Sequence, residues 1–289
     1  MPNFSIQYKK LHRSVVISGK SQSTFSNYAR CLAHMAMYFQ SDVLELDDDA
    51  ILDYLHHLKR KRKTPSDSFF KHTVYGLRYL YRIYEKESRA VILPSIERPK
   101  KYPVVLSQQE VKALLVAPTL LRHRLIIGLL YGCGLRNHEL CKLKITDLDL
   151  ERQMLHVREG KGRKDRYVPL CDMLVRGVKK YLDAEHPVEY LFNGKNRTGE
   201  YVAMSTRGVQ WAIREARRNS GIRKQVTAHC LRHTYATHLL EMGTDIVTLK
   251  ELLGHAHIDT TMEYLHVARI GRSSAFSPLE KLYEKGRDS

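Results

Sequence analysis

The chain has 289 residues, 43% of them hydrophobic and 27% charged, which is typical of globular protein and leaves room for two ordinary domains. Lysine and arginine outnumber aspartate and glutamate by 48 to 31, so the formal net charge is +17. Such an excess makes a polyanion, above all nucleic acid, the first partner to expect. An incidentally basic enzyme or a protein of membrane surfaces is the alternative.

The cysteines and the apolar segments argue against several classes of protein. The five cysteines are widely spaced and contain no CxxC pair, so neither a disulfide framework nor a zinc ribbon is expected. The N-terminus is polar and basic rather than signal-like, and no run of about 18 apolar residues occurs. We therefore expect a cytoplasmic protein, associated with the nucleoid in a bacterium, and no membrane partner.

Residues 23–40 predict an amphipathic helix, because apolar side chains recur there at steps of three and four residues. These side chains are Phe25, Tyr28, Leu32, Met35 and Phe39. Residues 46–63 predict a second helix, with Asp47, Asp48 and Asp49 near its start, where three aspartates suit a helix N-terminus better than a metal site. They end in a basic run of five residues, Lys59, Arg60, Lys61, Arg62 and Lys63.

A third helix is expected over residues 68–86, with one apolar face formed by Phe70, Val74, Leu77, Tyr81 and Tyr84. The three segments together predict a small helical domain over residues 1–90, whose first helix begins near residue 23. Residues 91–106 hold three prolines with basic residues between them, which is typical of an extended linker. Ser107 and Glu110 then stand at capping-box spacing and predict the first helix of a second domain.

The second domain, residues 107–270, is predicted to be mostly α with a small β-hairpin. Residues 154–157 and 167–170 are β-prone and flank a Gly160-Lys161-Gly162 turn. Helices are expected over residues 171–182, 205–221, 229–243 and 245–254, of which the last two close at Gly243 and Gly254.

Four separated stretches of this domain carry cationic side chains or histidines. In the first, two glycines break an apolar helix and leave Arg136 at the next helix start, where free amides and a guanidinium suit a phosphate. In the second, Lys161 lies at the hairpin tip, with Arg163, Lys164 and Arg166 nearby. Each of these features, taken alone, is ordinarily a solvated surface charge.

The third stretch places His229 and Arg232 three residues apart, so that one helix face offers two donors to a single anion. His233 and His238 in the same stretch are expected to be structural. In the fourth, residues 253–266, Gly254 ends a helix, His255 follows it, and Asp259 is expected to cap a short helix that displays Tyr264. The histidines of this stretch, His255, His257 and His266, do not match a zinc site, and a tyrosine at such a position is ordinarily part of a core.

Taken in order, four motifs resemble the tyrosine recombinase (integrase) family, Xer-like in size and layout. They are GLRNHEL around Arg136, EGKGRKDRYVPL around Lys161, HCLRHTYATHLL with His229 and Arg232, and LGHAHIDTTMEYLH with His255 and Tyr264. Order, spacing and local context all agree in this half of the chain. The similarity of residues 1–90 to the family's DNA-clamping domain rests on pattern alone. Cys230 and His257 stand where the family often has other residues, but no catalytic position is replaced.

The resemblance implies a mostly α fold with a small β-hairpin or sheet. An α+β catalytic domain over residues 107–270 would follow a helical SAM-like core-binding domain and a Pro-rich linker. Residues 271–289 would be a tail exchanged between protomers. A first helix near residue 23 argues against a further arm-site domain ahead of the clamp. The implied activity is site-specific cleavage and rejoining of DNA through a covalent 3′-phosphotyrosine, with no cofactor and no metal.

The resemblance also implies a role for each site residue. Arg136 and Arg232 would clamp the scissile phosphate, His229 and His255 would donate hydrogen bonds or handle the tyrosine proton, Lys161 would protonate the departing 5′-hydroxyl, and Tyr264 would be the nucleophile. Glu139 either orients Arg136 or forms a surface pair with it. The expected DNA contacts are Lys59, Arg60, Lys61, Arg62, Lys63, Arg163 and Lys164.

The partner implied is double-stranded DNA with inverted-repeat core sites, on which the enzyme would form a tetramer, alone or with a second recombinase. Two alternatives stay open: a catalytically silent DNA-binding regulator of the same fold, and a type IB topoisomerase. The complete set of catalytic residues disfavours the regulator, since binding does not need a tyrosine, and the clamp and tail favour recombination over relaxation. These motifs specify neither the target sequence nor the biological role, whether dimer resolution, integration, excision or inversion.

Overall fold

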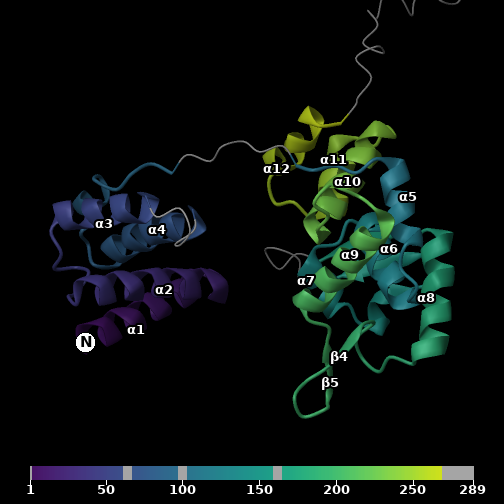
Figure 1. The fold of residues 1–289 in the computed structure, drawn as a ribbon, viewed down its shortest axis with the longest axis horizontal. Helices are drawn as coiled ribbons and strands as arrows, with labels where there is room; N and C mark the ends of the chain where they lie inside the picture. The colour runs from purple at the N-terminus through teal and green to yellow at the C-terminus, as the bar shows by residue number, and fades with distance from the viewer. Residues whose placement is uncertain (1, 61–66, 97–102, 159–164, 269–289) are drawn as a thin grey trace, which may run out of the picture. The chain divides into compact units, whose positions relative to one another are not determined.

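The structure, a computed structural model, describes residues 2–60, 67–96, 103–158 and 165–268. The chain divides into two compact units, Met1–Lys100 and Lys101–Ser289, whose elements are drawn in Figure 1. Several predicted features lie outside the described residues: part of the linker, the tail, and Lys61, Arg62, Lys63, Lys161, Arg163 and Lys164.

The first unit is helical throughout its described part. Its elements are α1 (Pro2–Ile17), α2 (Gln22–Phe39), α3 (Asp48–Arg60), α4 (Asp67–Ile83) and the 3₁₀ helix η1 (Glu87–Ala90). The third helix starts as predicted, since the Asp47 carboxylate accepts a hydrogen bond from the Ala50 amide. The second is capped by Ser21, whose side chain accepts a hydrogen bond from the Thr24 amide. The predicted helices over residues 23–40, 46–63 and 68–86 therefore correspond to α2, α3 and α4.

The prediction that the first helix begins near residue 23 is wrong, because α1 precedes it. The buried stripe of α1 consists of Gln7, Leu11 and Val15, while Ile6 and Ile17 are exposed. A buried glutamine and exposed isoleucines hide the period of 3.6 residues that a helix normally shows in sequence. Only packing against α2 and α4 makes this face a core face.

The core of the first unit is apolar and aromatic. Leu32 and Met35 of α2 lie against Val74, Leu77 and Tyr81 of α4, and all five side chains are buried. The apolar face predicted for residues 68–86 is thus the one that α4 buries. The burial of this apolar surface away from water makes the largest favourable contribution to the packing of the four helices.

The second unit combines helices with two small antiparallel sheets. Its longer helices are α5 (Gln108–Val116), α6 (Leu121–Gly132), α7 (Asn137–Lys142), α8 (Asp172–Glu185), α9 (Thr206–Ser220), α10 (Ala228–Glu241) and α11 (Ile246–Leu253). Shorter pieces are η2 (Ile145–Asp147), α12 (Asp259–Met262) and η3 (Glu263–His266). The apolar helix α6 packs against α5, α8, α9 and α10 and forms the centre of this unit (Figure 1). As predicted, α5 starts with a capping box between Ser107 and Glu110.

The predicted hairpin is present as two strands of a three-stranded sheet. Strands β1 (Leu148–Asp149), β2 (Met154–Val157) and β3 (Arg166–Pro169) lie in the order β1-β2-β3, and Val157 faces Arg166 across the β2–β3 ladder. A second, unpredicted sheet pairs β4 (Asn193–Lys195) with β5 (Tyr201–Ala203). Strand β3 also contacts α11, which brings the end of the hairpin beside the C-terminal helices.

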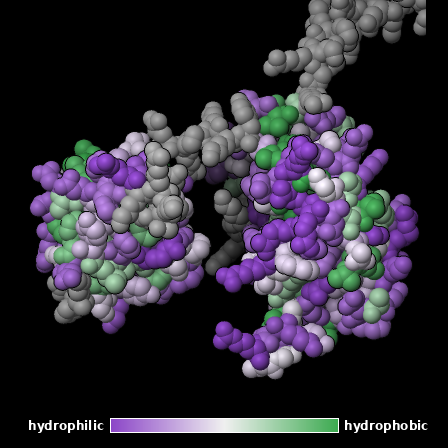
Figure 2. All heavy atoms as spheres, in the orientation of Figure 1, coloured by the Kyte–Doolittle hydropathy of each residue, from purple (hydrophilic) through white to green (hydrophobic). Residues whose placement is uncertain are grey.

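The surface matches the composition. In Figure 2, hydrophilic residues dominate the visible face of each unit and apolar residues form small separate areas among them. Within the described ranges, no helix is long and apolar enough to span a membrane.

Candidate active site

The loop between α6 and α7 places the first arginine. Gly134 has φ +59°, and a Cβ on it would lie 2.4 Å from the ring of Tyr235, so both its conformation and its surroundings require glycine. Arg136 follows as the N-cap residue of α7, as the sequence predicted. Its guanidinium is therefore set at the start of a helix, where it bonds to Glu139 and to the Gly254 carbonyl oxygen.

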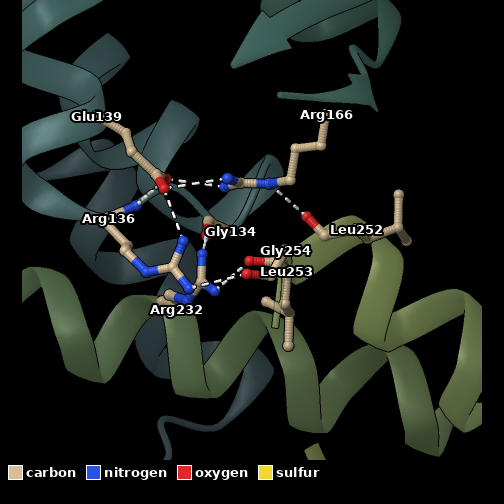
Figure 3. Close-up of polar contacts among 8 residues, drawn as sticks. All are labelled: Gly134, Arg136, Glu139, Arg166, Arg232, Leu252, Leu253 and Gly254. Carbon is tan, nitrogen blue, oxygen red and sulfur yellow. Dashed lines mark hydrogen bonds and ion pairs between the residues drawn. The ribbon is translucent and has the colours of Figure 1, made fainter. Parts of the chain in front are cut away.

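Glu139 binds two arginines with its two carboxylate oxygens (Figure 3). Arg136 donates from Nη1 to Oε1 at 2.7 Å and from its backbone amide to Oε2 at 2.8 Å. Arg166 donates from Nη1 to Oε1 at 3.0 Å and from Nη2 to Oε2 at 2.8 Å. The Glu139 side chain is only 1% exposed, so the surface-pair reading of Glu139 is wrong and its contact with Arg136 is buried.

The ionisation of Glu139 follows from these contacts. Burial alone would raise the pKa of the carboxyl group, but hydrogen bonds and the charge of Arg166, with further bonds from Arg136, hold the pKa at about 2. Glu139 is therefore a carboxylate at neutral pH. The two flanking arginines keep a net positive charge in its neighbourhood.

Arg232 is buried within α10 and is 2% exposed. Its Nη1 donates to the carbonyl oxygen of Gly134 and its Nη2 donates to that of Leu253 (Figure 3). Burial, and then the charge of Arg136, lowers the pKa of Arg232 to about 10, which still leaves the guanidinium charged at pH 7. A buried guanidinium that is bound by neutral carbonyl oxygens and lies near other arginines favours an incoming anion.

Two histidines of α10 lie beside Arg232. His229 is exposed near the helix start, and its ring meets that of His233 edge-on at 4.1 Å between centroids. Although the residue is exposed overall, partial removal of its ring from water, and then the charges of Arg232 and Arg136, lowers the pKa of His229. Burial, and then His229 and Arg232, lowers the pKa of His233 to about 4, so His233 is neutral at pH 7.

Tyr264 lies in η3 and is 3% exposed. Its ring belongs to a small apolar cluster with Leu240 of α10 and Leu249 and Leu253 of α11. Its hydroxyl oxygen lies 3.1 Å from Nδ1 of His233. Burial raises the pKa of Tyr264, although the nearby charge of Arg232 works in the opposite direction. The apolar ring is thus packed in this cluster, while the hydroxyl points toward His233 and Arg232 of α10.

The helix that precedes Tyr264 begins differently from the prediction. Ile258, not Asp259, occupies the N-cap position of α12, and no side chain caps this helix. Asp259 is the first residue inside the helix, where its charge favours the positive end of the helix dipole. The predicted cap position is therefore wrong by one residue. Whether a residue is the cap or the first residue of a helix depends on its backbone angles, which the sequence does not show.

His255 leaves the end of α11 directly after Gly254, which adopts φ +62°. Nδ1 of His255 contacts Oγ1 of Thr261 at 3.0 Å, and the ring lies nearly parallel to that of Tyr264 at 6.3 Å. Burial, and then the charges of Arg232 and Arg136, lowers the pKa of His255 to about 3. Among the described residues, no group of three or more His, Cys, Asp or Glu side chains is arranged to hold a metal ion.

The structure thus brings together five of the six predicted catalytic residues, from α7, α10, the loop after α11 and η3. They are Arg136, His229, Arg232, His255 and Tyr264. The sixth, Lys161, lies outside the described residues. Lys59 and Arg60, expected to contact DNA, are exposed at the end of α3, in the other unit.

Two residues at the site were missed from sequence. His233 was assigned a structural role, yet it contacts the Tyr264 hydroxyl, and its position one turn after His229 on the same helix face was the available signal. Arg166 was seen only as one of several basic residues near the hairpin. His238 fits its structural assignment, since it bonds to the Tyr131 hydroxyl and the Leu106 carbonyl oxygen.

Comparison with known proteins identifies the family. The sequence model of the phage integrase family matches residues 104–269, which is more than half of the chain. The chain belongs to the phage integrase family. Among curated relatives, the tyrosine recombinase XerA of Thermococcus onnurineus is 37% identical over 276 residues, covering 94% of this chain and 92% of the relative. A tyrosine recombinase of Thermosipho africanus is 34% identical over 262 residues, covering 86% and 90%.

Solved structures agree with this assignment. A crystal structure of XerA recombinase is 29% identical, covers 99% of both chains and has a TM-score of 0.53. The XerH site-specific recombinase bound to a palindromic difH substrate is 23% identical, covers 87% of this chain and 78% of that chain, and shares the fold with a TM-score of 0.71. This member of the phage integrase family is a tyrosine-type, site-specific DNA recombinase, and its helix-rich fold with small antiparallel sheets is that of the family.

Proposed function

We propose that this recombinase cuts DNA by attack of Tyr264 on a scissile phosphate held by Arg136, Arg232, His229 and His255. One observation carries the proposal: a buried tyrosine hydroxyl contacts His233 and lies within the field of two arginines, Arg232 and Arg136, that come from separate elements. Binding DNA alone needs neither a buried tyrosine nor buried guanidinium groups. Stabilising extra negative charge on a phosphate under attack needs both.

The chemistry follows from the residue types. A tyrosine hydroxyl is a weak nucleophile at neutral pH, but its attack yields a phosphotyrosine ester that conserves the energy of the broken bond for strand rejoining. Arg136 and Arg232 supply fixed positive charge where the pentacoordinate phosphate gains charge. His229 and His255, neutral at pH 7, act as hydrogen-bond donors to the phosphate oxygens.

Two further roles complete the site. Lys161, expected from the resemblance to the family, would protonate the departing 5′-hydroxyl. Glu139 would orient Arg136, which it binds through both the side chain and the backbone amide. A partner strand's 5′-hydroxyl would then attack the phosphotyrosine and exchange strands.

Double-stranded DNA with inverted repeats is the proposed substrate. The XerH relative was solved on a palindromic substrate, and an excess of 17 positive charges suits a polyanion. We further propose that both units bind DNA, with Lys59 and Arg60 among the phosphate contacts, and that protomers assemble as a tetramer linked through residues 271–289. In the same proposal, the protein acts on nucleoid DNA in the cytoplasm, either alone or with a second recombinase as its partner.

The decisive experiment is to incubate the protein with a nicked DNA substrate that traps covalent complexes. Tyr264→Phe is expected to bind DNA like the wild type and to form no protease-sensitive adduct. Tyr131→Phe is the matched control, because it removes the hydroxyl of another tyrosine that contacts a histidine of α10, and it should keep the adduct. An adduct formed by Tyr264→Phe would refute the assignment of the nucleophile.

The same experiment separates the alternatives. A regulator without cleavage would give no adduct with the wild-type protein either. A topoisomerase would give the adduct and relax a supercoiled plasmid that lacks paired sites, whereas a recombinase needs two sites to exchange strands.

A further inference from the structure

Arg166 is a buried cation that the proposed chemistry does not use. It is the first residue of β3, at the end of the hairpin, and is 8% exposed. Its Nε donates to the carbonyl oxygen of Leu252 at 2.8 Å, at the end of α11, while Nη1 and Nη2 both bind Glu139. Figure 3 shows the guanidinium lying between Glu139 and Leu252. Since these partners occupy its donors and its exposure is small, Arg166 is not placed to bind DNA.

Arg166 and Arg136 share one carboxylate. Oε1 of Glu139 accepts from Nη1 of both arginines, and Oε2 accepts from Nη2 of Arg166 and from the backbone amide of Arg136. A bidentate arginine fixes both the position and the plane of the carboxylate. The orientation of the carboxylate then fixes the direction of the Arg136 guanidinium, which also donates to the Gly254 carbonyl oxygen at 3.3 Å.

The charge balance gives Arg166 a second effect. With Arg136 alone, Glu139 would form a simple ion pair that neutralises the arginine. With Arg166 present, one carboxylate faces two guanidinium groups, and Arg232 adds a third nearby. Three positive charges against one negative charge leave a net charge of 3 − 1 = +2 in a largely buried space, which favours a phosphate.

Arg166 also connects the elements that carry the site. Through Glu139 it reaches α7, and through Leu252 it reaches the end of α11, from which His255 emerges two residues later. The fit at this junction is close, because a Cβ on Gly254 would lie 3.0 Å from Cδ of Arg166. One side chain of the hairpin thus holds both the Arg136 helix and the His255 loop.

We propose that Arg166 is a positioning residue for strand cleavage, which fixes Glu139 and through it aims Arg136 at the scissile phosphate while keeping that arginine's charge available. This inference rests on the proposed function in one respect, namely that Arg136 binds the phosphate. Arg166 itself touches no DNA.

The first test is single-turnover cleavage of a nicked substrate by Arg166→Met. We expect cleavage to fall about 100-fold and DNA affinity to change by no more than about twofold. The reason is that Arg136 would no longer be oriented toward the scissile phosphate, whereas the contacts with the rest of the duplex would remain. Arg166→Lys keeps the charge but cannot bind both carboxylate oxygens, and it should fall about tenfold. If Arg166→Met does not fold, Arg166→Lys carries the test alone.

A matched control is Arg158→Met. Arg158 follows β2 and pairs with the buried Asp147 at the end of η2, so this change also removes an arginine from a buried carboxylate close to the same sheet. Arg158→Met should cleave at the wild-type rate. A double-mutant cycle adds to this: Glu139→Gln combined with Arg166→Met should cleave no more slowly than Arg166→Met alone, because the two residues act through one path.

The substrate itself separates positioning from folding. A methylphosphonate at the scissile position lacks one negative oxygen and so needs less positive charge from Arg136. The deficit of the Arg166 variants should therefore shrink to less than about tenfold for Arg166→Met on this substrate. A deficit of the same size on both substrates, or full activity of the variants on ordinary DNA, would overturn the inference. Because wild-type protein must first form the Tyr264 adduct, failure of the proposed function is recognised separately.

Discussion

Both units of the molecule have a buried apolar core, but the second also holds a buried cluster of charged side chains, so two buried centres of opposite chemistry can be compared. In the first unit, Leu77 and Tyr81 of α4 are fully buried among other apolar and aromatic side chains. In the second, Arg232, Glu139 and Arg166 are buried nearly as completely. Equal burial therefore does not imply an equal contribution to stability.

The physical reason is the cost of removing charge from water. Burying apolar surface stabilises a fold by roughly 25 cal/mol per Å², whereas a buried ion pair recovers its desolvation cost only with good geometry and further hydrogen bonds. The carbonyl oxygens of Gly134, Leu252 and Leu253 provide those bonds here. We infer that the apolar centre maintains the fold and that the charged centre is retained for chemistry, and the following predictions test that division.

The largest effect is expected from Arg232→Ala. Removing a guanidinium that faces the phosphate should lower single-turnover cleavage on the order of 10³-fold, in line with the loss of one preorganised donor to a developing charge. Affinity for DNA should change far less, because other phosphates of the duplex still meet the basic surface. Equal loss of cleavage and affinity would make Arg232 a mere anchor, which filter-binding and cleavage assays on the same samples would reveal.

Leu77→Ala, in the apolar centre of the first unit, should lower stability and leave cleavage unchanged. The side chain is 0% exposed, and truncating such a leucine costs about 2–5 kcal/mol of unfolding free energy. The only tryptophan of the chain, Trp211, lies in α9 of the second unit, so its fluorescence reports that unit while circular dichroism reports both. We expect an earlier transition by circular dichroism alone and an unchanged cleavage rate for the DNA-bound protein. A shifted tryptophan transition would contradict the separation of the two centres.

Acid should weaken the charged centre before the apolar one. The pKa of Glu139 is about 2 in the folded protein against an ordinary 4.5, so the unfolded chain binds this proton more tightly. The corresponding stability, roughly 3 kcal/mol from a shift of this size, is present above pH 4.5 and is lost as the pH falls through that value toward 2. Tryptophan-detected unfolding from pH 6 to 3 should show this slope, and Glu139→Gln should flatten it.

The smallest effect is expected from His233→Gln. The histidine contacts the Tyr264 hydroxyl, and a glutamine can keep a hydrogen bond there only with altered geometry. Adduct formation should slow about tenfold with DNA affinity unchanged. His238→Gln is the control, since it alters another buried histidine of α10 that contacts Tyr131 instead. A variant that forms the adduct faster than the wild type would show that His233 restrains the tyrosine instead of assisting it.

Periodicity and capping predicted most of the second unit and three of the four helices of the first. Strong apolar periods marked α2 and α4, and Ser107 with Glu110 marked the start of α5. The same signals failed for α1, whose buried stripe includes Gln7, and for Asp259, which lies one residue inside its helix. A sequence pattern reveals the buried face of a helix only when the residues of that face are apolar. In α1, tertiary packing buries the polar Gln7, so the pattern is hidden.

The sequence by itself determined which residue types were available for the reaction, because the order and spacing of Arg136, His229, Arg232, His255 and Tyr264 are local properties of three short motifs. Only the tertiary structure decided which groups support them. Arg166 lies 27 residues from Glu139 and 86 from Leu252 along the chain, and a basic residue near a hairpin turn gives no sign of such partners. Burial and hydrogen bonding across elements, not local pattern, make a surface-like arginine part of the site.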